Sequence, residues 1–217
     1  MSEVEFLSGS QNIPAYQIGK GDKGVILIAD VYGYRYDEMR RIANLLAGEG
    51  FIVLLPDLFR GDPRKIGEDR SSFQEWREKH PTERVMADIK AAAAFMRKSV
   101  KKLAVLGFCW GGLQSFNAAQ TGLFDSAVDF YGARMDVTGA SKITCPFLGI
   151  FGGKDPSISS EEISALESEL KKAKKVYQVK VFKDCGHAFV QKRENYNEQT
   201  SKEALALAID WLKKTLA

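Results

Sequence analysis

Residues 102–116 read KLAVLGFCWGGLQSF, and they place a cysteine between an apolar strand and a helix. The short apolar run Lys102–Gly107 predicts the strand, and the pattern over Trp110–Thr121 predicts the helix. The glycines before and after Cys109, at positions 107 and 111, permit the tight strand-to-helix turn called a nucleophile elbow. The first turn of a helix also favours a thiolate. The stretch therefore predicts a cysteine nucleophile, and the alternative is a buried cysteine beside glycines that ease helix packing.

The alternation of strand and helix repeats along the chain. Near-continuous apolar runs predict buried strands at Gly24–Tyr32, Phe51–Phe59, Lys102–Gly107, Ser126–Tyr131, Pro146–Phe151 and Val176–Phe182. Apolar residues at helical spacing predict helices at Tyr36–Gly48, Thr82–Val100, Trp110–Thr121, Ser159–Ala173 and Ser201–Leu216. Residues 60–80 form either a long loop or a short helical excursion. Strands separated by helices predict an α/β fold, with a mostly parallel sheet and helices on both faces, in one domain over residues 1–217.

Composition narrows the functional class. The chain has 217 residues, with 31 basic and 28 acidic side chains interspersed, so we expect no nucleic-acid surface. Three cysteines make an odd and sparse set that suits a reducing compartment. The N-terminus lacks the pattern of a signal peptide, and no apolar run approaches membrane-spanning length. We therefore expect a cytoplasmic protein that acts on a small molecule, as a monomer or weak homodimer.

A thiol nucleophile needs a base, and the chain offers two histidines. His80 lies in a polar segment before a helix, where we expect it to be solvated. His187 follows the strand at 176–182, where an α/β-hydrolase places its histidine. Asp155 directly follows the strand at 146–151 and lies between nucleophile and histidine in chain order, whereas Asp184 is the competing acid. Cys109, Asp155 and His187 each fall just past the carboxyl end of a strand, the edge where open parallel sheets bind ligands.

An oxyanion formed during attack needs two N–H donors. The residue after the nucleophile, Trp110, supplies one candidate, and Val31 in the loop after an early strand supplies the other. Asp30 beside it is either a capped turn residue or a group facing the thiol. Cys185 and His187 provide only two local metal ligands, so we expect no metal site and no cofactor.

Six segments together resemble the dienelactone hydrolase family, carboxymethylenebutenolidase and its homologues, within the α/β-hydrolases. They are ADVYGYR, LLPDLF, GFCWGG, FYG, GGKDP and GHAFV, and they run from about residue 30 to residue 190. The resemblance implies an α/β-hydrolase fold, hydrolysis of esters or lactones, a triad of Cys109, His187 and Asp155, and an oxyanion hole from Val31 and Trp110. It also implies that the acid at position 30 pairs with the resting thiol and helps it to ionise. Most family members have glutamate there, and this chain has aspartate.

The family's reference members hold a substrate carboxylate with two arginines. Arg70 aligns with one of them, but Gln191 stands at the second position, with Lys192 and Arg193 after it. This departure leaves open whether dienelactone itself is cleaved, or another anionic or small ester or lactone. The expected substrate contacts are Arg70, Tyr32, Tyr131 and Arg193.

Two other functions fit the same residues less closely. A thioesterase or broad carboxylesterase would share the fold and the nucleophile. A non-catalytic binding protein or thiol redox sensor would need neither Asp155 nor His187 in that chain order.

Overall fold

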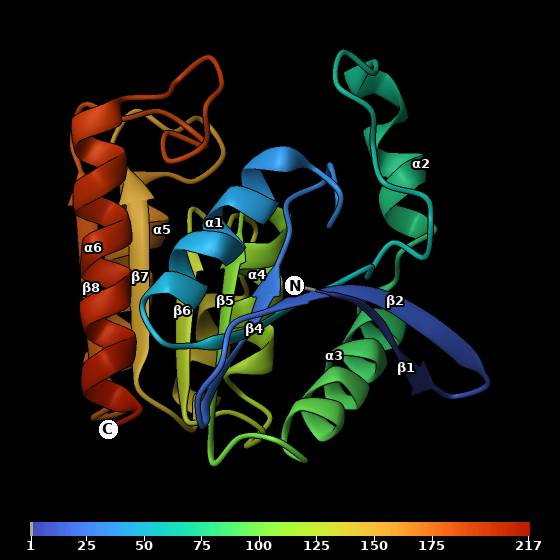
Figure 1. Cartoon of the computed structure of the whole chain (residues 1–217). Helices are drawn as coiled ribbons and strands as arrows, with labels where there is room; N and C mark the ends of the chain where they lie inside the picture. The colour runs from blue at the N-terminus through green and yellow to red at the C-terminus, as the bar shows by residue number, and fades with distance from the viewer. Residues whose placement is uncertain (1) are drawn as a thin grey trace.

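The structure, a computed structural model, describes residues 2–217 apart from the side chain of Arg70. These residues form an eight-stranded sheet in the order β1-β2-β4-β3-β5-β6-β7-β8 (Figure 1). The strands are β1 (Ser2–Ser8), β2 (Gln11–Ile18), β3 (Lys23–Ile28), β4 (Ile52–Pro56), β5 (Lys102–Phe108), β6 (Ser126–Phe130), β7 (Phe147–Gly152) and β8 (Tyr177–Phe182). Strands β3 to β8 pair in parallel, and β2 pairs antiparallel with both β1 and β4. The prediction of a mostly parallel sheet is confirmed.

Helices cover both faces of this sheet, as the alternation of strand and helix predicts. They are α1 (Asp37–Gly48), α2 (Phe73–Glu78), α3 (Thr82–Met96), α4 (Trp110–Ala118), α5 (Ser160–Lys172) and α6 (Glu198–Thr215), with 3₁₀ turns η1 (Arg70–Ser72) and η2 (Val137–Lys142). Along β6, Ala127 packs with the cluster that includes α3, α4 and α5, whereas Val128 and Phe130 pack with α1 and α6. Successive side chains of a strand point to opposite faces, so each helix layer buries one face of the sheet.

Two strands end earlier than their apolar runs predict. β3 ends at Ile28, and a turn follows in which the N–H of Gly33 donates to the carbonyl of Asp30 over 3.0 Å. β4 ends at Pro56, after which the carboxylate of Asp57 accepts from the N–H of Phe59. Short polar side chains compete with the sheet for backbone groups in this way. The early ends convert residues 29–36 and 57–64 into loops above the carboxyl edge of the sheet.

The N-terminal hairpin of β1 and β2 is not among the strands that the sequence predicts. β1 is exposed at four of its seven residues, so its apolar period is weak, and β2 carries Pro14, a residue that strands usually confine to edges. The hairpin gains its stability from the body of the protein. Phe6 packs against Phe95 of α3, with ring centroids 5.9 Å apart, and the carbonyl of Pro14 accepts from Asp57 N–H.

Residues 60–80 contain a short helix, so the second of the two alternatives for this segment holds. In Figure 1, α2 stands above the same sheet edge toward which the arrowhead of β7 points. The indole N–H of Trp76 anchors the segment by donating to the carbonyl of Asp62 over 2.8 Å. The prediction that His80 is solvated is wrong, because this residue is 7 % exposed and packs against Trp76 and Phe59.

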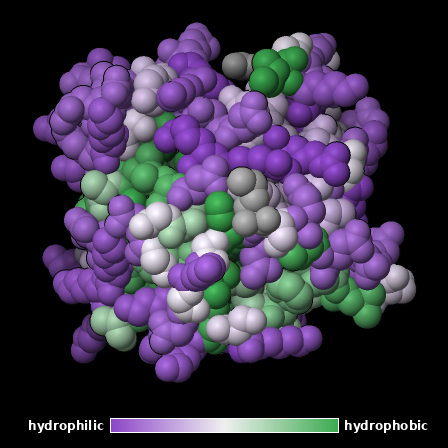
Figure 2. All heavy atoms as spheres, in the orientation of Figure 1, coloured by the Kyte–Doolittle hydropathy of each residue, from purple (hydrophilic) through white to green (hydrophobic). Residues whose placement is uncertain are grey.

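The outer surface is mainly hydrophilic on the face shown in Figure 2, with smaller hydrophobic areas between the polar side chains. Among the described residues, the exposed large hydrophobic side chains are Leu7, Ile66, Val176 and Val181. Val176 and Val181 lie at and in the edge strand β8, whereas Leu7 and Ile66 lie in other segments. Within residues 2–217, no helix combines the length and apolar character that crossing a bilayer requires.

Candidate active site

Cys109 occupies a strained turn between β5 and α4. Its backbone has φ +56° and ψ −115°, a left-handed conformation that non-glycine residues seldom adopt and that clusters at functional sites. Two close approaches make the turn possible. A Cβ at Gly107 would lie 1.9 Å from the carbonyl oxygen of Gly111, and a Cβ at Gly111 would lie 2.4 Å from that of Ile28. The N–H of Cys109 donates to the carbonyl of Phe130 over 2.9 Å, which fixes the turn to β6.

His187 and Asp155 meet at the same edge of the sheet. The imidazole Nδ1 of His187 lies 2.6 Å from Oδ2 of Asp155, whose side chain is completely buried. The other oxygen of Asp155 accepts from the N–H of Ser157 over 2.8 Å, so the carboxylate is held from both sides. The competing acid, Asp184, points away, with a side chain 89 % exposed and paired with Lys154. The structure therefore gives His187 the partner that chain order predicts.

The imidazole of His187 is held in its charged form. Burial disfavours the imidazolium, but hydrogen bonds to Asp155 and Cys109, together with the charges of these two groups, outweigh it and raise the pKa of His187 to about 10. The ring of Tyr131 packs edge-on against the imidazole, with centroids 5.2 Å apart. The surroundings of the ring, a buried carboxylate on one side and the sulfur of Cys109 on the other, thus favour the imidazolium over the neutral imidazole.

The two expected oxyanion donors come from the start of α4 and from the loop after β3. Trp110 is the first residue of α4, where backbone N–H groups have no acceptor within the helix. Its indole packs against Phe59 with ring centroids 4.6 Å apart, which holds the start of the helix. The carbonyl of Val31 accepts from the N–H of Arg64 over 2.8 Å, and this bond ties the loop after β3 to the loop after β4. Val31 and Cys109 line the same pocket.

A pocket of about 560 Å³ opens above the thiol and the imidazole. Tyr32 and Arg193, two of the expected substrate contacts, line it together with Cys109 and His187. Its charged lining residues are four basic and two acidic ones, namely Arg64, Lys65, Arg134, Arg193, Glu68 and Glu194. Two of the basic residues are paired with carboxylates, Arg193 with Asp30 and Arg64 with Glu68. Arg64 and Arg134 were not singled out from the sequence, because neither lies in a recognisable motif.

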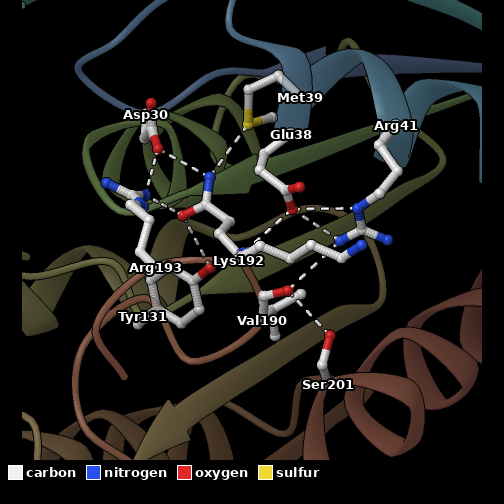
Figure 3. Close-up of polar contacts among 10 residues, drawn as sticks. Asp30, Glu38, Met39, Arg41, Tyr131, Val190, Lys192, Arg193 and Ser201 are labelled. Atoms are coloured by element: carbon white, nitrogen blue, oxygen red, sulfur yellow. Dashed lines mark hydrogen bonds and ion pairs between the residues drawn. The ribbon is translucent and has the colours of Figure 1, made fainter. Parts of the chain in front are cut away.

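Asp30 is buried and tied to its surroundings, as Figure 3 shows for its side chain. One carboxylate oxygen caps the turn by accepting from Tyr32 N–H over 2.9 Å, and the other accepts from Gln191 and Arg193. Burial raises the pKa of Asp30, and the charge of Arg193 opposes that shift. Of the two interpretations, the capped turn residue describes these contacts. The pairing of Asp30 with the thiol remains a prediction.

Gln191 is the centre of a buried polar network. From the sequence, this position was notable only because it lacks the arginine of the family's reference members. Its amide oxygen accepts from the hydroxyl of Tyr131 and from Arg193, and its amide nitrogen donates to Asp30 over 2.7 Å. Tyr131 is 0 % exposed, so the expected contact between Tyr131 and substrate is corrected: this residue lies behind the pocket. The side chain of Arg70 lies outside the described residues.

Comparison with known proteins decides the family. The family description "Dienelactone hydrolase family" matches residues 13–216, nearly the whole chain. The chain belongs to the dienelactone hydrolase family. A carboxymethylenebutenolidase homolog of Xenopus tropicalis is 36% identical over 202 residues, which cover 89% of this chain and 82% of that one. The human carboxymethylenebutenolidase homolog is 30% identical over 201 residues, with 88% and 82% covered.

Solved structures show the same architecture. A Klebsiella pneumoniae protein assigned to the dienelactone hydrolases superposes with a TM-score of 0.90 and 26% identity, over 98% of each chain. An esterase of Pyrococcus furiosus, with a TM-score of 0.76 and 16% identity over 100% of this chain and 91% of that one, shares the fold. The fold is thus that of the α/β-hydrolases, as the resemblance implies. As a member of the dienelactone hydrolase family, the protein is a carboxylic ester hydrolase.

Proposed function

We propose that the protein hydrolyses small esters or lactones through an acyl-thioester on Cys109. The observation that carries this proposal is the placement of the His187 imidazole. Its Nδ1 is bound to buried Asp155, and Cys109 is close enough to raise the pKa of the imidazole. A nucleophile, a base and an orienting acid in this arrangement form a catalytic triad.

Before acylation, the Cys109 thiol passes its proton to the neutral His187 imidazole, which leaves a thiolate beside an imidazolium. The sulfur attacks the carbonyl carbon, the C–S bond forms, and the carbonyl oxygen becomes an oxyanion. The N–H groups of Val31 and Trp110 stabilise this oxyanion, and one such donor is worth about 2.7–4 kcal/mol of barrier. As the tetrahedral intermediate collapses, the C–O bond of the ester breaks and the imidazolium gives its proton to the leaving alkoxide.

Deacylation reverses the proton movement. Neutral His187 takes a proton from water, the resulting hydroxide attacks the thioester carbonyl, and the C–S bond breaks to release the carboxylic acid. Asp155 keeps Nδ1 of the ring as a donor, so that Nε2 is the nitrogen that exchanges protons. A lactone would leave as a single hydroxy acid, because its alcohol and acid remain joined.

The substrate we propose carries a negative charge. Four of the six charged residues that line the pocket are basic. Arg193 contributes one of the guanidinium groups, and its cation–π contacts with Tyr32 and Tyr36 hold it at the wall of the pocket. The carboxymethylenebutenolidase names of the relatives support a lactone or ester carbonyl as the reacting group.

Trapping the covalent intermediate tests the nucleophile directly. We would incubate the protein with a slowly hydrolysed aryl ester, quench in acid and locate the acyl group by peptide mass spectrometry. Cys145 and Cys185 serve as internal controls, because burial raises the pKa of Cys145 to about 12 and also raises that of Cys185. We expect the acyl group on Cys109 alone, and no adduct with Cys109→Ala.

A panel of lactones, aryl esters and acyl thioesters, each in a neutral and a carboxylate-bearing form, tests the substrate. We expect higher kcat/KM for the anionic member of each ester or lactone pair. A preference for acyl thioesters would favour a thioesterase instead. Full hydrolysis by Cys109→Ala would contradict the proposed mechanism.

A further inference from the structure

The loop between β8 and α6 carries His187, and it is fixed on both sides of the histidine. Before His187, the carbonyl of Cys185 accepts from the N–H of Lys154 over 2.9 Å, which ties the loop to the segment after β7. After it, the carbonyl of Val190 accepts from the hydroxyl of Ser201 over 2.9 Å, which ties the loop to α6 (Figure 3). The carbonyl of His187 lies between these two anchors and has a different partner.

The backbone directly after His187 is strained. Ala188 has φ +59°, in the left-handed region that residues with a Cβ seldom adopt. Free of its surroundings, an alanine would favour the right-handed region over this one by a factor of about 5–30. Such a residue keeps its conformation only where neighbouring groups hold it. The peptide between His187 and Ala188 therefore needs a restraint, because its rotation would carry the imidazole with it.

Asn195 contacts this peptide. Its side-chain Nδ2 donates to the carbonyl oxygen of His187 over 2.9 Å, and that carbonyl belongs to the peptide whose plane turns with φ of Ala188. Gly186 makes room for the amide, because a Cβ there would lie 3.0–3.1 Å from the side-chain amide atoms of Asn195. Within residues 2–217, the bond from Asn195 is the one hydrogen bond to the backbone of His187. The amide is thus placed to hold the strained peptide.

Asn195 also belongs to the wall of the active-site pocket. It lines the same cavity as Cys109 and His187, and its own side chain is exposed. The triad and the oxyanion hole make no use of this residue. Because the side chain is exposed, its removal leaves no hole in the core, and an effect on the site would have to pass through the peptide after His187 or through the substrate.

We propose that Asn195 is a positioning residue for His187, whose side-chain amide holds the peptide between His187 and Ala188 in the orientation that keeps the imidazole on Asp155. This inference rests on the proposed role of His187 as the base of the triad. Without the amide, Ala188 relaxes toward its ordinary backbone conformation in most molecules, and Nδ1 of His187 moves away from the carboxylate. The competent arrangement then remains in a minor fraction of the protein, and kcat falls with that fraction.

The hydrogen-bonded proton on Nδ1 of His187 gives a spectroscopic test that does not depend on ester hydrolysis. The chain has two histidines, so comparison with His80→Gln assigns the ¹H–¹⁵N signal. In Asn195→Ala we expect the downfield proton signal to move upfield, because fewer molecules make the bond to Asp155. The matched control is Asn197→Ala, which removes the N-cap of α6 from the same loop, and its signal should stay in place.

The kinetics of a double variant distinguish a positioning role from a contact with the substrate. We expect kcat for an aryl ester to fall by about tenfold in Asn195→Ala, as most molecules leave the left-handed conformation at position 188. Glycine adopts positive φ about as readily as negative φ, so adding Ala188→Gly to that variant should restore kcat to within about threefold of the parent. A side chain that acted by touching the substrate would not be replaced in this way.

An unchanged Nδ1 proton signal in folded Asn195→Ala would overturn the proposal, as would equal losses of kcat in the single and the double variant. A signal that moves as far in Asn197→Ala would also overturn it, because the order of the whole loop would then hold the histidine. If the double variant does not fold, the signal of Asn195→Ala decides alone. Failure of Cys109 to form an acyl adduct would overturn the proposed function instead and leave the spectroscopic result interpretable.

Discussion

The two histidines of this chain occupy opposite electrostatic environments. His187, at the pocket, binds a buried carboxylate, and its pKa is raised to about 10. His80, at the corner between α2 and α3, lies 2.8 Å from a guanidinium nitrogen of Arg84, and burial together with that positive charge lowers its pKa. Arginine can only donate, so Nδ1 of His80 must accept and the ring must be neutral.

The comparison shows that burial alone does not determine the charge of an imidazole. Burial works against the charged form of both rings. At His187, Asp155 and Cys109 outweigh burial. At His80, burial and the positive charge of Arg84 outweigh the carboxylate of Asp62, which lies 3.4 Å from Nε2. One histidine is therefore suited to hold and transfer a proton. The second packs with Phe59 and Trp76 and supports Trp110 from behind.

The two histidines should differ most in the kcat that remains after each imidazole is removed by substitution. We expect His187→Ala to lower kcat for an aryl ester on the order of 10⁶-fold, the loss typical of removing the histidine of a triad. His80→Gln should lower it by less than about tenfold, because Gln can still accept from Arg84. Steady-state kinetics on folded variants, checked by circular dichroism, measure both. Comparable losses of kcat in the two variants would show that the two histidines do not differ in function.

The next effect concerns the acid that gives His187 its charge. We expect Asp155→Asn to lower kcat on the order of 10⁴-fold, because the amide no longer holds the required tautomer. Asp184→Asn is the matched control, since Asp184 is exposed and forms a surface ion pair with Lys154. Its kcat should stay within about twofold of the parent, as is usual for exposed ion pairs. Equal losses would transfer the orienting role to Asp184.

A third experiment measures the two pKa values themselves. The imidazole signals of a ¹H–¹⁵N NMR titration should show a pKa near 10 for His187 and a pKa below the ordinary value for His80. In Asp155→Asn the pKa of His187 should fall, because the hydrogen bond and the charge that raise it are both lost. Two rings that titrate together near pH 6.5 would contradict the comparison.

Much of the site could be predicted because its signals are local. Gly107, Cys109 and Gly111 determine a turn by steric contact, and Asp155 and His187 each follow directly after a strand. In a parallel sheet the carboxyl ends of strands meet at one edge, so these positions predict proximity without knowledge of the packing. The same reasoning predicted the parallel part of the sheet and its helix layers.

The misplaced residues depend on contacts between distant segments. His80 reads as solvated because its neighbours in sequence are polar, and only the fold brings Phe59 and Arg84 to it. Asp30 and Gln191 are 161 positions apart, and no sequence pattern in either segment predicts the hydrogen bond between them. Buried polar networks of this kind are fixed by tertiary packing, which a single sequence does not display.

The smallest expected effect is on the stability of the protein, and it tests the charge of His80 without relying on activity. Because the pKa of His80 is lower in the folded protein than in the unfolded chain, the unfolded state binds more protons as the pH falls through about 6.5. The parent should therefore lose stability between pH 7 and pH 5, and part of that loss should be absent in His80→Gln. The substitution itself should cost about 1 kcal/mol at pH 8, where both side chains are neutral. Urea unfolding at pH 8, 6.5 and 5 measures the difference. A stability gap between parent and variant that does not narrow toward pH 5 would show that Arg84 does not hold His80 in its neutral form.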